Sequence, residues 1–389
     1  MRQHRDRLVK LWLAVLVAVV LSGCGKAQPA ESGYREIGSW MSVTDGGIVT
    51  TYPEPLQFVD FSSKESAVLC SEPDCDHQWH SDNDYCPAFE EHRYPFVYNG
   101  ELYFFRSEMY RDSEGEVVDT CNLMKSDVSG TNEKTVCSVP GPGVTSLYVY
   151  LDQDVLYFPV NEYESSGAGN DERKVTLYAC DLRGREAESC GVLVEGKDAS
   201  VRTYGMTEDQ MFYDTFTFTA DVEADMTAEE IEALIEIKSY VMDVKTKEVR
   251  ANELPKPVLV YGGCYYYNRD DGLYSRRLAD GSETLIAERM FETERGLSCY
   301  YADGKLFISE CSVAGSAVDT YLRYYDMKSG KLVDIGENNK VCTTVEAAYK
   351  DEYFLSLSDY KQEDSTTKLA YIKKSDFLKG ELDRYILLN

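Results

Sequence analysis

The sequence predicts an all-β protein, a β-propeller of six or seven four-stranded blades with one inserted amphipathic helix. Three observations lead to this prediction. A unit made of an acidic or Asn-Gly turn, an aromatic-rich strand and a Gly-containing hairpin recurs at intervals of roughly 30 to 55 residues, the range of propeller blades. Its turns place Gly where the backbone needs a positive φ. The 30 tyrosines suit strands packed face to face, because each buries a ring and extends a hydroxyl to a polar rim.

The first 24 residues have the pattern of an export signal. Four basic residues precede the apolar run LWLAVLVAVVL, which ends in Leu-Ser-Gly-Cys at 21–24. Such a run is too short to cross ~30 Å of hydrocarbon comfortably. The ending resembles the lipobox of bacterial lipoproteins. This resemblance implies that residues 1–23 are a signal peptide and that a lipid is attached to Cys24. The alternative is an ordinary cleaved signal followed by a chance cysteine.

The segment after the signal and the net charge of the chain indicate which partners to expect. Residues 24–44 are predicted to be the lipidated Cys24 and a flexible tether, because GKAQPAESG is small and polar. The body would then lie at the outer face of the cell membrane, with the membrane as a partner through the N-terminal lipid. Without its signal the chain's net charge goes from −28 to −31, because four basic residues and one acidic residue are removed. Such a body repels phosphate backbones, so we expect no nucleic-acid partner.

The propeller is predicted over residues 45–389. Six copies of the repeat are clear, and a seventh, weaker copy lies at the front. The clear copies span 98–137, 151–195, 207–251, 261–288, 301–336 and 349–388, and the weaker copy spans 45–70.

One helix is predicted, inserted in the third clear copy. Thr227-Ala228-Glu229-Glu230 is a capping box. Ile231, Leu234, Ile235 and Ile237 follow it on one helical face. Such a helix in a β-rich chain most often packs on its own blade, and the alternatives are a cover for a pocket or a contact with a partner.

The repeats also resemble a known family. The stretch DGLYSRRLADGSETLI at 271–286 is the plainest case. It resembles the secreted propellers related to TolB and to the YWTD-type receptors, and above all the propeller lipoproteins of Gram-positive anaerobic bacteria. The resemblance implies the fold and says little of function. The YWTD tetrapeptide itself is missing from the sequence, so receptor-type ligand binding is not implied.

The cysteines are numerous. Of twelve, eleven follow Cys24, an odd number, so at least one is free, metal-bound or paired between molecules. Two pairs flank turns and are predicted as cross-strand disulfides, with free buried thiols as the alternative: Cys121 with Cys137, and Cys180 with Cys190. The four later cysteines are predicted to be core residues within strands: Cys264, Cys299, Cys311 and Cys342.

A Cys/His-rich connector is predicted over residues 70–92. It holds the pattern C-x4-C-x-H-x2-H-x5-C, and closely spaced Cys and His on a loop can surround one zinc ion. Part of it, C-x-x-P-x-C-x-H, resembles a stretch recurring in the related lipoproteins, which favours His77 as the nitrogen ligand. The predicted ligands are Cys70, Cys75, His77 and Cys86, with His80 as the alternative to His77. Four protein ligands leave no open position, so the zinc would be structural. A disulfide among the three cysteines and a redox pair are the alternatives.

The sequence motifs do not indicate a particular reaction. The sequence holds no nucleophile elbow, Walker loop, dinucleotide fingerprint or HExxH. Outside the signal its histidines are His77, His80 and His92, so a histidine base would have to come from that stretch. We therefore expect a binding or interaction module: a sensor, a solute or glycan binder, or a scaffold for envelope proteins. The alternative is an extracytoplasmic carbohydrate-active enzyme with its site at the channel mouth. A third possibility is a rigid spacer.

Overall fold

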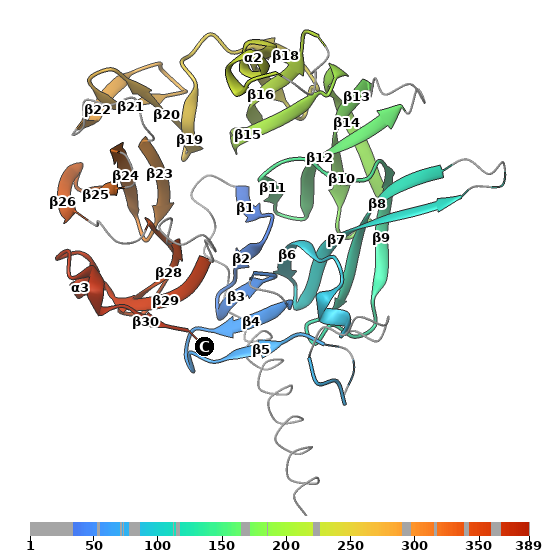
Figure 1. The fold of residues 1–389 in the computed structure, drawn as a ribbon, viewed down its shortest axis with the longest axis horizontal. Coiled ribbons are helices and arrows are strands. Elements are labelled where there is room, and N and C mark those ends of the chain that lie inside the picture. The colour runs from blue at the N-terminus through green and yellow to red at the C-terminus, as the bar shows by residue number, and fades with distance from the viewer. Residues whose placement is uncertain are drawn as a thin grey trace, which may run out of the picture. The chain divides into compact units, whose positions relative to one another are not determined.

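The computed structural model describes residues 34–388 apart from several short segments: 53–54, 71, 73, 78–85, 112, 114–116, 165–171, 185, 221–225, 290–296, 315–316, 338–341 and 359–366. The fold is a seven-bladed β-propeller of four-stranded antiparallel blades (Figure 1). This confirms the predicted fold class and decides between six and seven blades. The predicted signal peptide and Cys24 lie outside the described residues. In the described part of the chain, no helix has the length and apolar character that a membrane span requires.

The chain divides into two compact units, residues 1–62 with 67–252 and residues 63–66 with 253–389. The first unit contains four blades. Blade 1 is β2 (Met41–Val43), β3 (Gly47–Thr50), β4 (Gln57–Asp60) and β5 (Ser66–Val68). Blade 2 is β6 (Arg93–Tyr98), β7 (Glu101–Arg111), β8 (Val117–Asp127) and β9 (Lys134–Pro140). Blade 3 is β11 (Tyr148–Asp152), β12 (Val155–Glu164), β13 (Glu172–Asp181) and β14 (Glu186–Lys197). Blade 4 is β15 (Ser200–Thr207), β16 (Gln210–Phe218), β17 (Ile235–Asp243) and β18 (Val249–Ala251).

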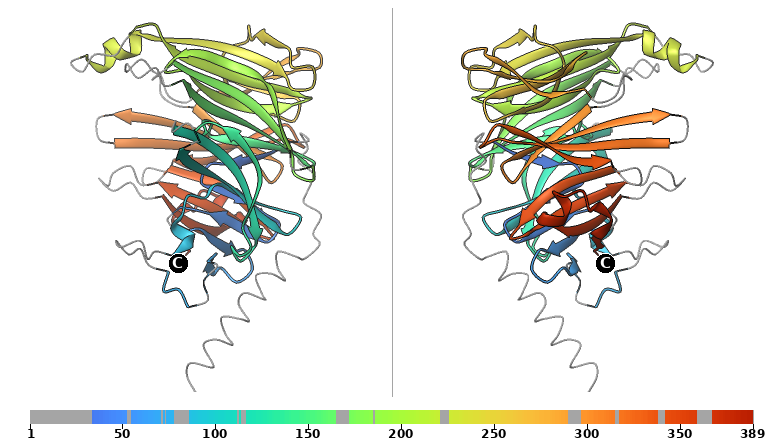
Figure 2. Two further views of the ribbon diagram at one scale, coloured as in Figure 1. Left: turned by 90° about the vertical axis from the view of Figure 1, so that its right-hand side faces the viewer. Right: turned by 90° about the vertical axis from the view of Figure 1, so that its left-hand side faces the viewer.

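The second unit contains three blades. Blade 5 is β19 (Pro257–Tyr261), β20 (Cys264–Arg269), β21 (Gly272–Arg277) and β22 (Glu283–Glu288). Blade 6 is β23 (Leu297–Ala302), β24 (Lys305–Ala314), β25 (Ala317–Asp326) and β26 (Lys331–Glu337). Blade 7 is β27 (Cys342–Tyr349), β28 (Glu352–Ser358), β29 (Thr367–Lys373) and β30 (Ile386–Leu387). Short helices α3 (Lys374–Phe377) and η2 (Leu382–Arg384) connect the last two strands. The side views in Figure 2 show the strands twisting within each sheet.

Blade 3 carries two additional strands. The N-terminal strand β1 (Tyr34–Gly38) pairs antiparallel with β11, and the two-residue strand β10 (Gly143–Val144) pairs with β12. Strand β1 also contacts β2, β6 and β15, so it touches the first strand of every blade in this unit. The tether predicted over residues 24–44 is therefore wrong from Tyr34 onward. Backbone pairing with β11 holds this polar segment in place, and composition alone does not reveal such pairing.

Turn chemistry follows the sequence closely. Asn99 and Gly100 join β6 to β7 with φ values of 50° and 78°, and Asp303 and Gly304 join β23 to β24 with 53° and 69°. Positive φ at both central residues is the geometry of type I′ hairpin turns, whose twist matches that of the flanking strands. The predicted role of the aromatic residues as core is also confirmed. The largest fully buried side chains include Tyr150, Tyr213, Tyr265, Tyr266, Tyr267 and Tyr353.

The predicted helix is shorter than expected. Helix α2 spans Ala228–Ala233, and its capping box is present: the Thr227 hydroxyl accepts from the Glu230 backbone N–H, and the Glu230 carboxylate accepts from the Thr227 N–H. Residues Ile235 and Ile237, expected on its apolar face, belong to strand β17, where they oppose Phe218 and Phe216 of β16. Sheet pairing prevails over helical periodicity here, since β-branched residues suit strands and the neighbouring strand supplies backbone partners.

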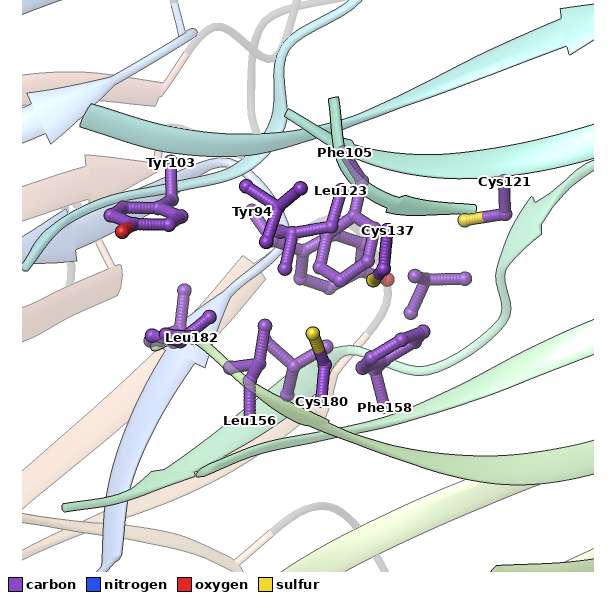
Figure 3. Close-up of a cluster of buried hydrophobic side chains, with 14 of the residues drawn as sticks. Tyr94, Tyr103, Phe105, Cys121, Leu123, Cys137, Leu156, Phe158, Cys180 and Leu182 are labelled. Atoms are coloured by element: carbon purple, nitrogen blue, oxygen red, sulfur yellow. The ribbon is translucent and has the colours of Figure 1, made fainter. Parts of the chain in front are cut away.

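Apolar side chains gather between successive blades. One cluster lies between blades 2 and 3 and includes Phe105, Leu123, Leu156 and Phe158 (Figure 3). A second, between blades 1 and 2, includes Leu56, Phe58, Leu102 and Phe104. The Cys/His connector follows β5, leads through η1 (Pro87–Phe89) and ends at β6, so it joins blades 1 and 2.

Candidate metal centre and the inner strand of the first unit

The structure brings together the four predicted ligands of the connector. Cys70 follows β5, Cys75 and His77 lie in the loop, and Cys86 is the N-cap residue of η1. One ligand atom from each residue lies within 4.8 Å of all the others. The alternative ligand His80 lies outside the described residues. Among the described residues, Cys70, Cys75, His77 and Cys86 form the group whose arrangement is suited to a metal ion.

The separations fit a tetrahedral ion. Zinc binds Cys sulfur at about 2.3 Å and His nitrogen at about 2.0–2.1 Å, so the edges of its tetrahedron are about 3.8 Å between sulfurs and about 3.5 Å from sulfur to nitrogen. The Cys86 Sγ lies 3.4 Å from Cys70 Sγ and 3.6 Å from His77 Nδ1. A disulfide needs about 2.05 Å between sulfurs, and the three cysteines are free thiols here.

Each of the three sulfurs accepts a hydrogen bond from the backbone N–H group two residues later. The N–H groups of Glu72 and His77 each lie 3.4 Å from the sulfur two residues earlier, Cys70 and Cys75 respectively. The Ala88 N–H donates to Cys86 in the same relation. His77 has a φ of 57°, a left-handed backbone that reverses the loop toward Cys86. Amide donors favour the thiolate, the form that metals bind.

The surroundings favour metal binding over redox chemistry. Cys70 and Cys75 pack against the apolar cluster between blades 1 and 2, which includes Cys86 itself. Burial, together with the neighbouring thiols, raises the pKa of Cys86 to about 12, and burial also raises that of Cys70. Reactive redox cysteines have lowered pKa values, so these thiols are inert unless a cation compensates their charge. A bound Zn²⁺ would supply that charge, and its four protein ligands would leave no position for a substrate.

The His92 side chain is held in place by several contacts. Its Nδ1–H donates to the Glu90 carbonyl at 2.6 Å, and its Nε2 lies 3.8 Å from the Glu133 carboxylate. The ring is buried and lies 4.4 Å from the centre of the Phe104 ring. Arg106 pairs with the same Glu133 at 2.9 Å. The nearby His92, followed by Arg106, lowers the pKa of Glu133. His92 is therefore a buried residue held by its contacts with Glu90, Glu133 and Phe104.

The predicted disulfide pairs are not formed. All four cysteines are buried free thiols. In the ladder between β8 and β9, Cys121 opposes Val139 and Cys137 opposes Leu123. The two cysteines are diagonal neighbours, which lie about 7–8 Å apart, whereas a disulfide needs Cβ atoms at about 3.8 Å. Cys180 and Cys190 lie in different apolar clusters, on either side of blade 3. These pairs were predicted because the two cysteines of each pair lie at about equal distances from a turn. The strand register and the pleat instead decide which side chains meet.

The later cysteines only partly follow the prediction. Cys299 is buried in β23, whereas Cys264 in β20 is half-buried. Cys311 and Cys342 lie in β24 and β27 as expected, but their side chains are outside the described part of the structure.

Strand β1 forms a second candidate site that sequence reasoning missed. Arg35 donates from Nη2 to the Val43 carbonyl at 2.6 Å and from Nη1 to the Val97 carbonyl at 3.2 Å, which ties β1 to blades 1 and 2. On the other side β1 pairs with β11, where Glu36 opposes Tyr150 and Gly38 opposes Tyr148. Directly opposed residues project from the same face of a sheet, so Glu36, Tyr148 and Tyr150 share one face.

This face presents an unpaired carboxylate beside phenol groups. The Glu36 side chain is exposed to solvent, and no described residue forms an ion pair or hydrogen bond with its carboxylate. Dense surrounding protein nevertheless raises its pKa to about 7. The buried Tyr150 hydroxyl lies near Glu36 and Thr203 but makes no well-aligned hydrogen bond. Burial, followed by the Glu36 charge, raises its pKa well above the usual value.

Aromatic surface adjoins the carboxylate. Tyr148 is 40% exposed, and its ring lies over Gly38, since a Cβ added to Gly38 would lie 3.9 Å from Tyr148 Cε1. The neighbouring Leu147 is also exposed, and its carbonyl accepts from Ser39 just after β1. Trp40 follows in the turn to β2 and is 54% exposed. The only sequence signal for this site is the short stretch YREIG, which lies where a tether was predicted.

No family model matches the sequence, and no curated protein is similar to it. Similar solved structures are those of β-propeller proteins. Puromycin hydrolase is 12% identical, with a TM-score of 0.48 over 96% of this chain and 55% of that one. The acylaminoacyl peptidase of Pyrococcus horikoshii is 12% identical, with a TM-score of 0.43 over 72% of this chain and 44% of that one. The oligogalacturonate lyase of Vibrio parahaemolyticus is 9% identical, with a TM-score of 0.40 over 73% and 84%. The chain thus spans about half the length of the first two, and the likeness is one of fold.

Proposed function

We propose that this protein is an extracytoplasmic binding module, held at the outer face of the cell membrane by a lipid on Cys24, that binds a hydroxyl-rich ligand such as a glycan segment. The observation that carries the proposal is the unpaired Glu36 carboxylate beside Tyr148 and Tyr150 on β1 and β11. The lipobox-like sequence at 21–24 supports the anchor.

The chemistry of this face suits sugar hydroxyls. A carboxyl group with a pKa of about 7 is present in both protonation states near neutral pH, so it can donate or accept a hydrogen bond. The Tyr150 hydroxyl behind it is fully buried and lacks a well-aligned partner, so it adds to the polar character of this face without contacting the ligand. The exposed Tyr148 ring offers an apolar face on which a sugar ring can stack. An apolar surface with a few convergent polar groups is the usual make-up of a small-molecule site.

The zinc site has a separate, structural role in this proposal. Cys70, Cys75, His77 and Cys86 would hold Zn²⁺ as a closed Cys₃His set. When bound, the ion would cross-link the connector between β5 and η1, where none of the described residues belongs to a helix or strand. It would stabilise the junction of blades 1 and 2 and take no part in ligand binding.

A glycan array followed by titration calorimetry tests the binding role. We expect at least one neutral glycan to bind, and Tyr148→Ala to weaken that binding by about tenfold or more, roughly 1.4 kcal/mol. Glu36→Ala should weaken it to a similar degree. Glu195→Gln, a change at an exposed carboxylate on the outer strand β14, should leave it unchanged.

Other outcomes would overturn the proposal in recognisable ways. Binding restricted to cationic ligands, and lost as the pH falls below 7, would point to an amine site. Hydrolysis or elimination of a bound glycan would favour the carbohydrate-active enzyme. If the protein is shown to be folded and binds no ligand, the remaining interpretation is that it acts as a rigid spacer.

A further inference from the structure

Two buried cysteines from different blades face each other in the apolar cluster between blades 2 and 3. Cys137 comes from β9, the outer strand of blade 2, and Cys180 comes from β13 of blade 3. Strand β9 packs on β12 and β14, the two neighbours of β13. Figure 3 shows the two sulfurs pointing toward one another across the interface, whereas Cys121 lies to one side.

The two thiols lie near each other in the same buried cluster (Figure 3), and the nearby Cys137, followed by burial, raises the pKa of Cys180 far above its usual value. Both side chains are almost fully buried, at 8% and 0% exposure for Cys137 and Cys180. The rest of the cluster is apolar, and no described group there completes a metal site.

We propose that Cys137 and Cys180 are a disulfide site, and that oxidation joins blade 2 to blade 3 by a covalent bond. The bond forms by thiol–disulfide exchange with an external disulfide, that of an oxidoreductase or of oxidised glutathione. Each cysteine loses a proton and the pair gives up two electrons, while the external disulfide accepts them and leaves as two thiols. An export address, as proposed above, supplies an oxidising compartment in which such bonds persist.

Burial of the two thiols determines at which stage of folding the disulfide forms. A thiol with a raised pKa holds little thiolate, and the thiolate is the attacking species. The closed interface also shields both sulfurs from a protein-sized oxidant. Exchange is therefore expected while the chain folds, before blades 2 and 3 close on one another. Once formed, the bond is protected from reductants by the same packing.

The test uses the full wild-type chain, with oxidised glutathione as the probe. The full chain is refolded from urea with or without oxidised glutathione, free thiols are alkylated, and linked peptides are identified by mass spectrometry. We expect one peptide pair joining Cys137 to Cys180, a mass lower by two hydrogens and no alkylation of either residue. A Cys121→Ala variant, altered in the same cluster, should give the same linked pair.

Several results would overturn the proposal. It fails if both thiols are alkylated after oxidation in a protein that is folded, or if either cysteine links instead to Cys121 or Cys190. A thermal readout supports the assignment independently. The linked form should unfold at a temperature about 5 °C above that of the reduced form. Because a reductant also acts on the Cys70, Cys75 and Cys86 thiols, the same comparison is made on Cys180→Ala, which should show no such difference.

Discussion

Lys64 and Glu352 form an ion pair although 288 residues separate them in the sequence. The Lys64 ammonium also lies 4.4 Å from the centre of the Phe354 ring and 4.9 Å from that of Tyr371. Residues 63–66, in the loop between β4 and β5, thus belong to the second unit. Both charged side chains are only 20% exposed, so water screens this pair less than a surface pair.

Removal of the Lys64 ammonium should destabilise the second unit. We expect Lys64→Met to lower the free energy of unfolding by about 1–2 kcal/mol, because both an ion pair and a partly desolvated cation–π contact are lost. Urea denaturation measures the change. Lys245→Met is the control: Lys245 pairs with Asp209 but is 69% exposed, so its loss should change the free energy of unfolding much less than the loss of Lys64. Equal effects of the two variants would refute the special role of Lys64.

Metal removal tests the Cys₃His centre. The purified chain should contain one zinc ion, and a chelator should remove this ion and lower the melting temperature of the protein. Zinc should also be released on acidification, since protons compete for the thiolates and the imidazole. Cys86→Ala should lose the ion, whereas Cys264→Ala, a half-buried cysteine in blade 5, should retain it. A stable fold with no bound metal, in which two of the three cysteines are joined by a disulfide, would instead support the disulfide alternative.

A buried ion pair inside blade 6 gives a third prediction. Arg323 donates to the Glu310 carboxylate at 3.0 Å and to the Glu288 carbonyl at 2.6 Å, and both charged side chains are 2% exposed. Arg323→Met leaves the Glu310 charge buried without its cation and should cost about 3–5 kcal/mol.

The double change Arg323→Met with Glu310→Leu should recover most of that loss, because two apolar side chains need no compensation. Denaturant midpoints measure both variants. Arg384→Met provides a matched control, since its pair with Glu381 is at the surface and 59% of the arginine is exposed. A double variant as unstable as the single one would contradict this account.

Glu36 should make stability depend on pH. Burial raises its folded pKa from the ordinary 4.5 to about 7, so the folded state holds the proton more tightly than the unfolded chain. For such a group, stability is highest below pH 4.5, falls as the pH rises toward 7 and levels off above that. Relative to wild type, Glu36→Gln should therefore be stabilised at pH 8 and equal at pH 4.

Solvent contact limits the size of this effect. Because the carboxylate keeps accessible surface, we expect about 1 kcal/mol at pH 8 rather than the full value of the shift. Urea denaturation at the two pH values measures it, with Glu195→Gln as a variant whose effect should not change with pH. A wild-type profile that Glu36→Gln leaves unchanged would show that this carboxylate is solvated like any other.

Much of this protein followed from its sequence. The Asn-Gly and Asp-Gly turns, the aromatic strands and the repeat spacing are local features, and they predicted the propeller because each acts within a few residues. The ligands Cys70, Cys75 and His77 lie so close together that their spacing alone suggested one site. The capping box at Thr227 is equally local, and it formed as predicted.

Only the tertiary structure decided which distant residues meet. Strand β1 became part of blade 3 because β11 offered it backbone partners, and this placed Glu36 beside Tyr150. Ile235 and Ile237 became strand residues because β16 lay alongside them. Cys180 came to face Cys137 rather than Cys190, because the pleat sends alternate side chains to opposite faces and the packing of neighbouring blades selects the partner on each face. Local sequence encodes turns and strands, but register and blade packing depend on contacts between segments that the sequence does not place side by side.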